Sequence, residues 1–151
     1  MYDEDSAIIQ LGALTDSMGM ILNTNIGAER LTGYTVDELR IMNIDNLMPN
    51  PFKYKHQFFL EEYYKTGISA IMSRERKTYL RKKDGNIVTI SLLVKPMFDT
   101  LNCNFSYISY IQKLNEQYQF ILTNRFGKIY GFSEYIGNYF GWSPDEFEKN
   151  H

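Results

Sequence analysis

Residues 29–39 read ERLTGYTVDEL, and this stretch carries the signals of two short helices joined at a glycine. Gly33 suits the end of the first helix, because glycine readily adopts the positive φ angle found there. Thr35 and Glu38 have the spacing of a capping box, which predicts that Thr35 caps the second helix. The same arrangement returns near the end of the chain, where residues 137–147 read GNYFGWSPDEF. The stretch therefore predicts a unit that occurs twice.

Around this stretch the chain repeats itself at a constant shift of 108 positions, so that residues 12–39 align with residues 120–147 without a gap. Seven aligned pairs are identical: Leu14/Leu122, Thr15/Thr123, Gly19/Gly127, Ile21/Ile129, Gly33/Gly141, Asp37/Asp145 and Glu38/Glu146. The second copy, residues 118–151, is shorter than a domain that usually folds unaided. We therefore expect the chain to be a fragment of a longer tandem array. The alternative is that residues 118–151 are a C-terminal extension packed on the first domain.

The elements on either side of this stretch predict an α+β fold with an antiparallel sheet. Two strands, at 8–14 and 20–23, precede the short helices. A longer helix follows at 52–65, where apolar and aromatic side chains recur with helical spacing. Three further strands are expected at 69–81, 87–94 and 105–111, and the turn Asp84-Gly85 joins the first two of these. The helical segment therefore lies, in sequence, between the second and third strands.

Composition limits the classes of protein to consider. The chain has 151 residues, of which 44% are hydrophobic and 15% aromatic, and its net charge is −2. It can therefore form one ordinary domain with a proper core, whereas a chain built chiefly to bind nucleic acid is usually basic. A single cysteine, Cys103, excludes an internal disulfide and a zinc site made of cysteines. No apolar run is long enough to span a membrane, and the acidic N-terminus lacks the pattern of a signal peptide.

The order of these motifs resembles the PAS family of sensory domains. The resemblance covers residues 8–113 and is carried by DSMGMI at 16–21, Asn25, ERLTGYTVDEL at 29–39, LMP at 47–49, HQFFLEEYYKTG at 56–67 and RKKDGN at 81–86. It implies a PAS-like five-stranded antiparallel sheet with the helical insert between strands 2 and 3. The second copy, at 118–151, resembles the start of another PAS domain, cut before its long helix and last three strands.

The resemblance implies a function without catalysis, because PAS domains as a family sense ligands, light or redox state, or hold partners. In agreement, the sequence has no Gly-rich phosphate loop, no nucleophile elbow and no zinc-protease motif. We expect a sensory or regulatory module of a larger protein, which contacts protein partners or senses a small ligand. Its partners would be other domains of the same protein, other proteins or a second PAS domain in a dimer, with no nucleic acid. A purely structural assembly module is an alternative.

A narrower likeness concerns residues 120–129, which read FILTNRFGKI. Following a PAS domain, this run is similar to one in large multi-pass membrane proteins of ciliates and amoebae, the tiny-macrocysts type. The likeness implies that the chain is a cytoplasmic segment of a membrane protein and does not itself insert into the membrane.

His56 is the residue with the sharpest chemical alternative. Haem-binding oxygen-sensor PAS domains have a histidine at the matching position, where it is the proximal ligand of the iron. In the same register Arg76 matches the distal arginine that contacts bound oxygen, and Ile71 matches a distal apolar residue. Against haem, Glu62 and Ala70 stand where those domains bind the propionates, and neither side chain can donate to a carboxylate. We therefore expect no cofactor and a structural His56, with haem bound by His56 as the alternative.

Candidate interface residues lie on the three C-terminal strands: Tyr79, Ile90, Leu92, Tyr107, Ser109 and Ile111. One face of the sheet has to cover the helices, and if the other face is also apolar it marks a partner or dimer interface. Little alternation separates the two faces over residues 87–94, which favours burial on both. The basic run at 74–83 predicts a solvated strand and hairpin, with an acidic protein surface or anionic lipid headgroups as alternative partners.

Overall fold

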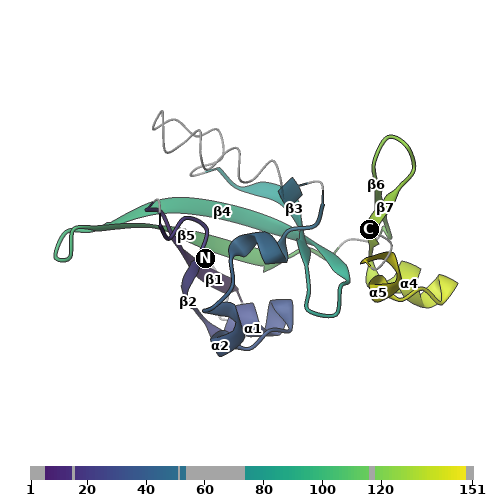
Figure 1. Ribbon diagram of the computed structural model, residues 1–151, viewed down its shortest axis with the longest axis horizontal. Coiled ribbons are helices and arrows are strands. Elements are labelled where there is room, and N and C mark those ends of the chain that lie inside the picture. Colours follow the sequence, from purple (N-terminus) through teal and green to yellow (C-terminus); the bar gives the residue numbers. More distant parts are fainter. Residues whose placement is uncertain (1–5, 15, 51, 54–73, 116–117, 149–151) are drawn as a thin grey trace.

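The fold is built on a five-stranded antiparallel sheet (Figure 1). The computed structural model describes residues 6–14, 16–50, 52–53, 74–115 and 118–148. The order of the strands in space is β2-β1-β5-β4-β3. Their bounds are β1 (Ala7–Gly12), β2 (Ile21–Thr24), β3 (Arg76–Arg81), β4 (Ile87–Asp99) and β5 (Asn104–Lys113). The predicted α+β fold, with helices inserted between strands 2 and 3 of the sequence, is confirmed.

Three short helices follow β2 and cover one face of the sheet: α1 (Ile26–Thr32), α2 (Val36–Leu39) and the 3₁₀ helix η1 (Ile44–Leu47). Asn25 caps α1, because its side-chain oxygen accepts a hydrogen bond from the backbone N–H of Ala28 at 3.1 Å. Gly33 ends α1 with a φ angle of 80°. Thr35 and Glu38 make both hydrogen bonds of the capping box that begins α2. The local signals read from the sequence thus set the bounds of these helices.

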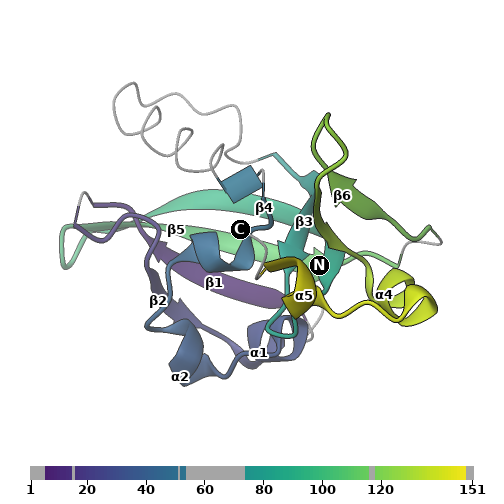
Figure 2. The ribbon, with the colours of Figure 1, turned by 45° about the vertical axis from the view of Figure 1, so that its right-hand side comes forward.

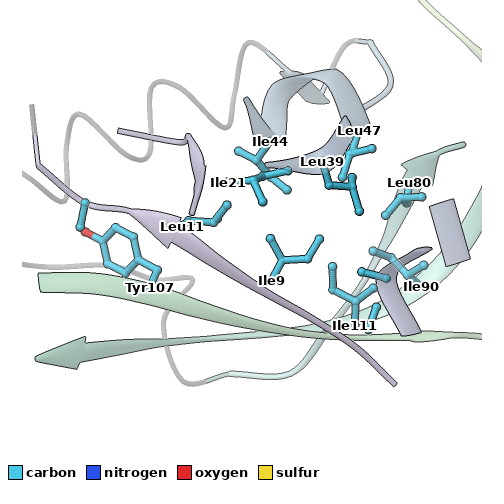
Figure 3. Packing of buried hydrophobic residues seen from close by; sticks show 13 residues of the cluster. Ile9, Leu11, Ile21, Leu39, Ile44, Leu47, Leu80, Ile90, Tyr107 and Ile111 are labelled. Atoms are coloured by element: carbon cyan, nitrogen blue, oxygen red, sulfur yellow. The ribbon is translucent and has the colours of Figure 1, made fainter. Parts of the chain in front are cut away.

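The core lies between the helices and the sheet (Figure 3). Along β1, Ile9 and Leu11 point toward the helices, while Ile8 and Gln10 point the other way. We call the side toward the helices the inner face and the opposite side the outer face. The inner face and the helices share a cluster of buried side chains, which includes Ile21, Leu39, Ile44, Leu47, Leu80, Ile90, Tyr107 and Ile111.

The hairpin of β4 and β5 is longer than the sequence predicts, because pairing continues as far as Asp99 opposite Asn104. Pro96 lies in this extension and lacks the N–H that a central strand needs. Within the described residues, β3 pairs with β4 from Arg81 opposite Ile87 to Arg76 opposite Leu92, so Pro96 lies outside that pairing.

The helical insert is described only in part. Of the predicted helix at 52–65, Phe52 and Lys53 lie within the described residues, and both are helical. β3 begins at Arg76, whereas the sequence predicted a strand from residue 69. Residues 69–73 lie outside the described residues, and residues 74–75 precede the strand.

Residues 118–148 form a second, smaller unit, which we call the C-terminal unit. It consists of the hairpin β6 (Ile121–Thr123) and β7 (Ile129–Phe132), followed by the helices α4 (Glu134–Phe140) and α5 (Pro144–Glu148). The hairpin pairs with itself and is separate from the five-stranded sheet. The unit lies beside the end of the sheet that β3 and the β3–β4 turn form (Figure 2).

Candidate functional site

The outer face of the sheet carries a buried apolar side chain where β3 and β4 meet their turn. Leu80 belongs to the core, so its neighbours Tyr79 and Arg81 point outward, together with their partners across the ladder, Thr89 and Ile87. Ile87 is nevertheless only 2% exposed. The outer face is therefore covered at this end, and the C-terminal unit supplies the cover.

The backbone of Gly131, in β7, lies directly on Ile87. A Cβ atom added at Gly131 would overlap Cδ1 of the Ile87 side chain, so no residue larger than glycine fits without movement. Phe132, the next residue, points to the other side of the hairpin, where its ring centre lies 5.7 Å from that of Trp142. The missing side chain at Gly131 thus lets the β6–β7 hairpin approach the sheet closely.

Tyr79 joins the helical insert to the C-terminal unit. Its ring centre lies 5.7 Å from that of Phe52, in the helical turn that follows η1. On its other side it lies 5.1 Å from the ring of Phe120, next to the start of β6. Both separations are within the range of favourable aromatic pairs. The three rings form a continuous path from one unit to the other.

The turn between β3 and β4 also touches both units. The Lys83 Nζ lies 2.9 and 3.1 Å from the two carboxylate oxygens of Glu38 in α2, and 5.7 Å from the centre of the Tyr34 ring. The hydrogen bond from Lys83 holds the pKa of the Glu38 carboxyl below its usual value. On the other side, a Cβ atom at Gly85 would lie 2.5 Å from the Cβ of Pro144 in α5. A displacement of the turn therefore alters contacts with both α2 and α5.

Of the three residues that would contact haem, only Arg76 lies within the described residues. It begins β3 on the inner face, opposite Leu92. Within the described part of the chain its Nε is a buried atom without a hydrogen-bond partner, and the loss of solvent around the guanidinium lowers the pKa of Arg76. His56 and Ile71 lie outside the described residues, as do Glu62 and Ala70. The structure thus places a guanidinium donor on the core side, and ligation by His56 stays a prediction.

Most of the candidate interface residues lie in the core. Four of the six are buried on the inner face: Ile90, Tyr107, Ser109 and Ile111. Leu92 shares that face and packs against the core. A partner cannot reach the four buried side chains in the folded domain, so a surface for partners has to be found elsewhere. Tyr79, in contrast, points outward and contacts the C-terminal unit.

Sequence reasoning missed the pair formed by Ile87 and Gly131. Ile87 was placed in a strand buried on both faces, but the sequence does not say what covers it. A glycine within an otherwise apolar and aromatic run is the available signal, because a glycine inside a strand often marks the close approach of another backbone or side chain. Gly131 stands between Tyr130 and Phe132, in a strand that is otherwise apolar or aromatic.

Other chemistry-bearing features are few in the described residues. None of the helices in the described ranges is long and apolar enough to cross a membrane. The same ranges contain no group of three or more His, Cys, Asp or Glu side chains that could hold a metal ion. Cys103 is exposed at the tip of the β4–β5 hairpin, with a φ angle of 50°.

Comparison with known proteins identifies the family. A family model described as "PAS domain" matches residues 5–113, which is more than half of the chain. The match ends at Lys113, where β5 also ends. The C-terminal unit lies beyond the matched range.

Solved structures share the fold at low sequence identity. A PAS domain from Colwellia psychrerythraea has a TM-score of 0.56 at 17% identity, covering 73% of this chain and 86% of its own. The PAS domain of an HTR-like protein from Haloarcula marismortui gives 0.58 at 15%, covering 74% and 84%. The PAS domain of the fruit-fly ELK potassium channel gives 0.56 at 16%, covering 74% and 89%.

A curated relative is similar over nearly the whole chain. It is a probable serine/threonine-protein kinase of Dictyostelium discoideum, 27% identical over 147 residues. These residues are 97% of this chain but only 9% of the relative's length. The relative is therefore a far longer protein, and the aligned part includes residues of both units.

Proposed function

Because the chain belongs to the PAS domain family, we propose that it is a sensory or regulatory module of a larger protein that signals to its C-terminal unit across the outer face of the sheet. PAS domains are generally sensory and non-catalytic. The observation that carries the proposal is the contact between Gly131 and Ile87, which ties the C-terminal unit to the sheet.

The route of the signal begins on the helical side of the sheet. Phe52 contacts Tyr79, and Tyr79 contacts Phe120 of the C-terminal unit. A small ligand or a partner that shifts the start of the Phe52 helix therefore changes the packing of Tyr79 and, through it, of β6. Signalling requires two arrangements of these rings that the ligand or partner binds unequally. The Lys83 turn, held between α2 and α5, supplies a second contact that moves with the sheet.

The partners in this proposal are protein surfaces. Other domains of the same protein are reached through the C-terminal unit. A second PAS domain, or another protein, would bind the outer face away from the C-terminal unit. A groove of about 250 Å³ lies there and is lined by Ile8, Gln10, Asn23, Thr24, Asn25 and Ile108. The cytoplasmic location and the likeness to tiny-macrocysts-type membrane proteins stay predictions.

The test is hydrogen–deuterium exchange on the whole chain with the substitution Phe52→Ala. We expect faster exchange at residues 120–123 as well as in β3, because the packing of Tyr79 changes on both sides. In a Gly131→Val background the response at residues 120–123 should become smaller, since the added side chain overlaps Cδ1 of Ile87 and the contact has to rearrange. Leu101→Ala, at the exposed tip of the β4–β5 hairpin, is the matched control and should change neither region.

If Phe52→Ala speeds exchange in β3 but not at residues 120–123, the result would contradict signalling to the C-terminal unit. In that case the contact between the units only holds them together, and the chain is a structural assembly module.

Haem-based gas sensing is the second candidate, and it is favoured by the Nε of Arg76 on the inner face, which has no hydrogen-bond partner in the described part of the chain. Arg76 would there donate to a ligand of the iron, and His56 would hold the iron. Bound haem would supply reversible binding of a diatomic gas. The absorption spectrum of the chain purified with added haem tests this proposal. A Soret band that His56→Ala abolishes would support haem, and no band in either sample would contradict it.

A further inference from the structure

The C-terminal unit separates its charges along the chain. Its hairpin half, residues 118–132, contains Arg125 and Lys128 and no acidic residue. Its helical half, residues 133–148, contains no lysine or arginine and has four acidic residues: Glu134, Asp145, Glu146 and Glu148. The hairpin half therefore has a formal charge of +2 and the helical half one of −4 at neutral pH. Surfaces from the two halves attract each other wherever they meet.

The two basic residues lie at the tip of the β6–β7 hairpin. Asn124 holds this turn, because its side-chain oxygen accepts hydrogen bonds from the N–H of Phe126 at 2.9 Å and the N–H of Lys128 at 3.0 Å. The Arg125 guanidinium lies 4.8 Å from the centre of the Phe126 ring, which is 79% exposed. A Cβ atom added at Gly127 would meet nothing within 4 Å among the described residues. The turn is thus a preformed projection that presents an open ring with a cation against it. We call Arg125, Phe126 and Lys128 the hairpin tip.

The helical half carries open aromatic side chains. Tyr135 and Tyr139 are exposed and lie one turn apart on α4, so they share a side of the helix. The ring of Phe140, also exposed, meets that of Tyr139 at 5.0 Å and stacks on that of Trp142 at 4.7 Å. A Cβ atom at Gly141, between Phe140 and Trp142, would meet nothing within 4 Å in the described part of the chain. There is therefore room beside these rings for a side chain from another molecule.

Two exposed carboxylates accompany these rings. Glu134 begins α4, directly before Tyr135, and Asp145 lies in the first turn of α5. Within the described residues neither carboxylate forms an ion pair, and the same holds for the cations of Arg125 and Lys128. We call Glu134, Tyr135, Tyr139, Phe140 and Asp145 the helical face. It combines open rings with negative charge, whereas the hairpin tip combines an open ring with positive charge.

The hairpin tip and the helical face lie at opposite ends of the C-terminal unit (Figures 1 and 2). Ile121 pairs with Phe132 at the end of the hairpin away from the tip, and α4 begins just beyond Phe132. The loop of the tip points away from α4 and α5 in both views. Within one molecule the two surfaces therefore stay apart, and only a second molecule can bring them together.

We propose that the hairpin tip of one copy of this chain binds the helical face of a second copy. Phe126 then packs on the rings of Tyr139 and Phe140, as aromatic side chains do in ordinary pairs. The two cations of the tip meet the two carboxylates of the face, and opposite charges guide and orient such encounters. Because the tip is already held in shape by Asn124, it loses little conformational freedom on binding.

A second copy is the occupant because it alone satisfies both surfaces. An anionic partner suits the hairpin tip and is repelled by the helical face, while a basic peptide suits the face and leaves the tip unused. The two surfaces differ, so the contact is heterologous, and each copy keeps a free tip or a free face that can bind the next copy. The contact lies outside residues 5–113 and does not rest on the signalling proposed above.

The experiment reverses the charges of each surface separately in the whole 151-residue chain. The tip variant is Arg125→Glu with Lys128→Glu, and the face variant is Glu134→Lys with Asp145→Lys. Sedimentation equilibrium at low salt measures the average mass over a wide range of concentration. We expect the mass of wild type to rise with concentration, and the dissociation constant of each variant alone to be at least about tenfold higher. An equimolar mixture of the two variants should associate again, because the acidic tip of one meets the basic face of the other.

Further variants separate this contact from a general effect of charge. Lys95→Glu with Lys113→Glu changes the net charge as much as the tip variant does, at exposed positions of β4 and β5, and should associate like wild type. Phe126→Ala keeps both cations of the tip and should weaken association, because the ring is lost. Trp142, the single tryptophan, reports on the face, so its emission should change with concentration in wild type but not in the tip variant.

Three outcomes would overturn the proposal. The first is a wild-type chain that stays monomeric at every concentration. The second is a mixture of the tip and face variants that does not associate, although circular dichroism shows that each variant is folded. The third is association that the tip variant leaves unchanged, or that the Lys95 and Lys113 control weakens equally, because the contact between copies would then lie on another surface, such as the groove of the outer face.

Discussion

Gly131 lies so close to Ile87 that a Cβ atom at Gly131 would overlap the isoleucine side chain. Ile87 is on the face of the sheet that points away from the core, yet it is buried, because the β6–β7 hairpin takes the place of solvent. The sheet of this PAS domain therefore has two buried sides at its β3–β4 end, one facing its own helices and one facing the C-terminal unit.

Ile87→Ala should weaken the attachment of the C-terminal unit. The substitution removes buried methyl groups and leaves a gap under Gly131, and truncations of this kind cost about 2 kcal/mol or more in a well-packed site. Urea unfolding followed by the emission of Trp142 measures the effect on the C-terminal unit. Met97→Ala, at an exposed position of β4, is the control. It should change the free energy of unfolding by less than about 0.5 kcal/mol. Equal losses in the two variants would contradict the contact.

Glu38→Gln should make the stability of the domain less dependent on pH. The pKa of Glu38 lies below its ordinary value of 4.5, first because of the hydrogen bond from Lys83. A carboxyl with a lowered pKa stabilises the fold above its unfolded pKa, and this contribution is lost as the pH falls through the folded value. We therefore expect the free energy of unfolding of wild type to exceed that of the variant at neutral pH and low salt. The difference should shrink as the pH falls below 4.5 and vanish below the folded pKa of Glu38.

Urea midpoints measured at several pH values check this prediction. Asp37→Asn, which removes the same charge from the exposed side of α2, is the matched control. A pH dependence that is equally reduced in both variants would show that the Lys83 partner has no special part, against the prediction. The difference should also shrink in high salt, because the pair is exposed.

Local chemistry predicted the elements whose signals lie within a few residues of one another. The capping box of Thr35 and Glu38, the end of α1 at Gly33 and the turn at Gly85 all have causes in their own short segments. The direction in which each strand residue points was harder to predict. Apolar residues occupy both faces of β4, and only the register decides which side is the inner face. For this reason the sequence predicts candidate interface residues at Ile90, Tyr107, Ser109 and Ile111, although the structure buries all four. The contact of Ile87 with Gly131 joins residues far apart in sequence, and no local pattern reveals it.

Thr35→Ala should destabilise the first unit by about 1 kcal/mol, the usual effect of losing a helix N-cap. The Thr35 hydroxyl oxygen accepts from the N–H of Glu38 at 3.1 Å, and this N–H loses its partner in the variant. Thermal unfolding measures the loss. Thr100→Ala, in the exposed tip of the β4–β5 hairpin, is the control for a threonine outside a cap. Equal melting temperatures for Thr35→Ala and wild type would contradict a stabilising cap.

Arg76→Met should leave the ligand-free domain at least as stable as wild type. Among the described residues the buried Nε of Arg76 has no hydrogen-bond partner, and a buried polar atom without a hydrogen bond opposes folding. Methionine keeps a long, unbranched side chain against Leu92 and removes the unsatisfied atom. Urea unfolding checks the prediction. A loss of more than about 1 kcal/mol would show that the guanidinium makes a stabilising interaction, contrary to this reading.

The proposed signalling requires that the first unit and the C-terminal unit are energetically coupled, and a double-mutant cycle of Tyr79→Ala and Phe120→Ala measures this coupling. The free energy of unfolding is measured by urea, with Trp142 emission as the signal, for wild type, both single variants and the double variant. The two rings lie 5.1 Å apart, so we expect a coupling energy of about 1 kcal/mol. If the effects of the two single substitutions add up to that of the double substitution within about 0.3 kcal/mol, the units are not coupled through this contact. That result would contradict the proposal, because uncoupled units cannot pass a signal through these rings.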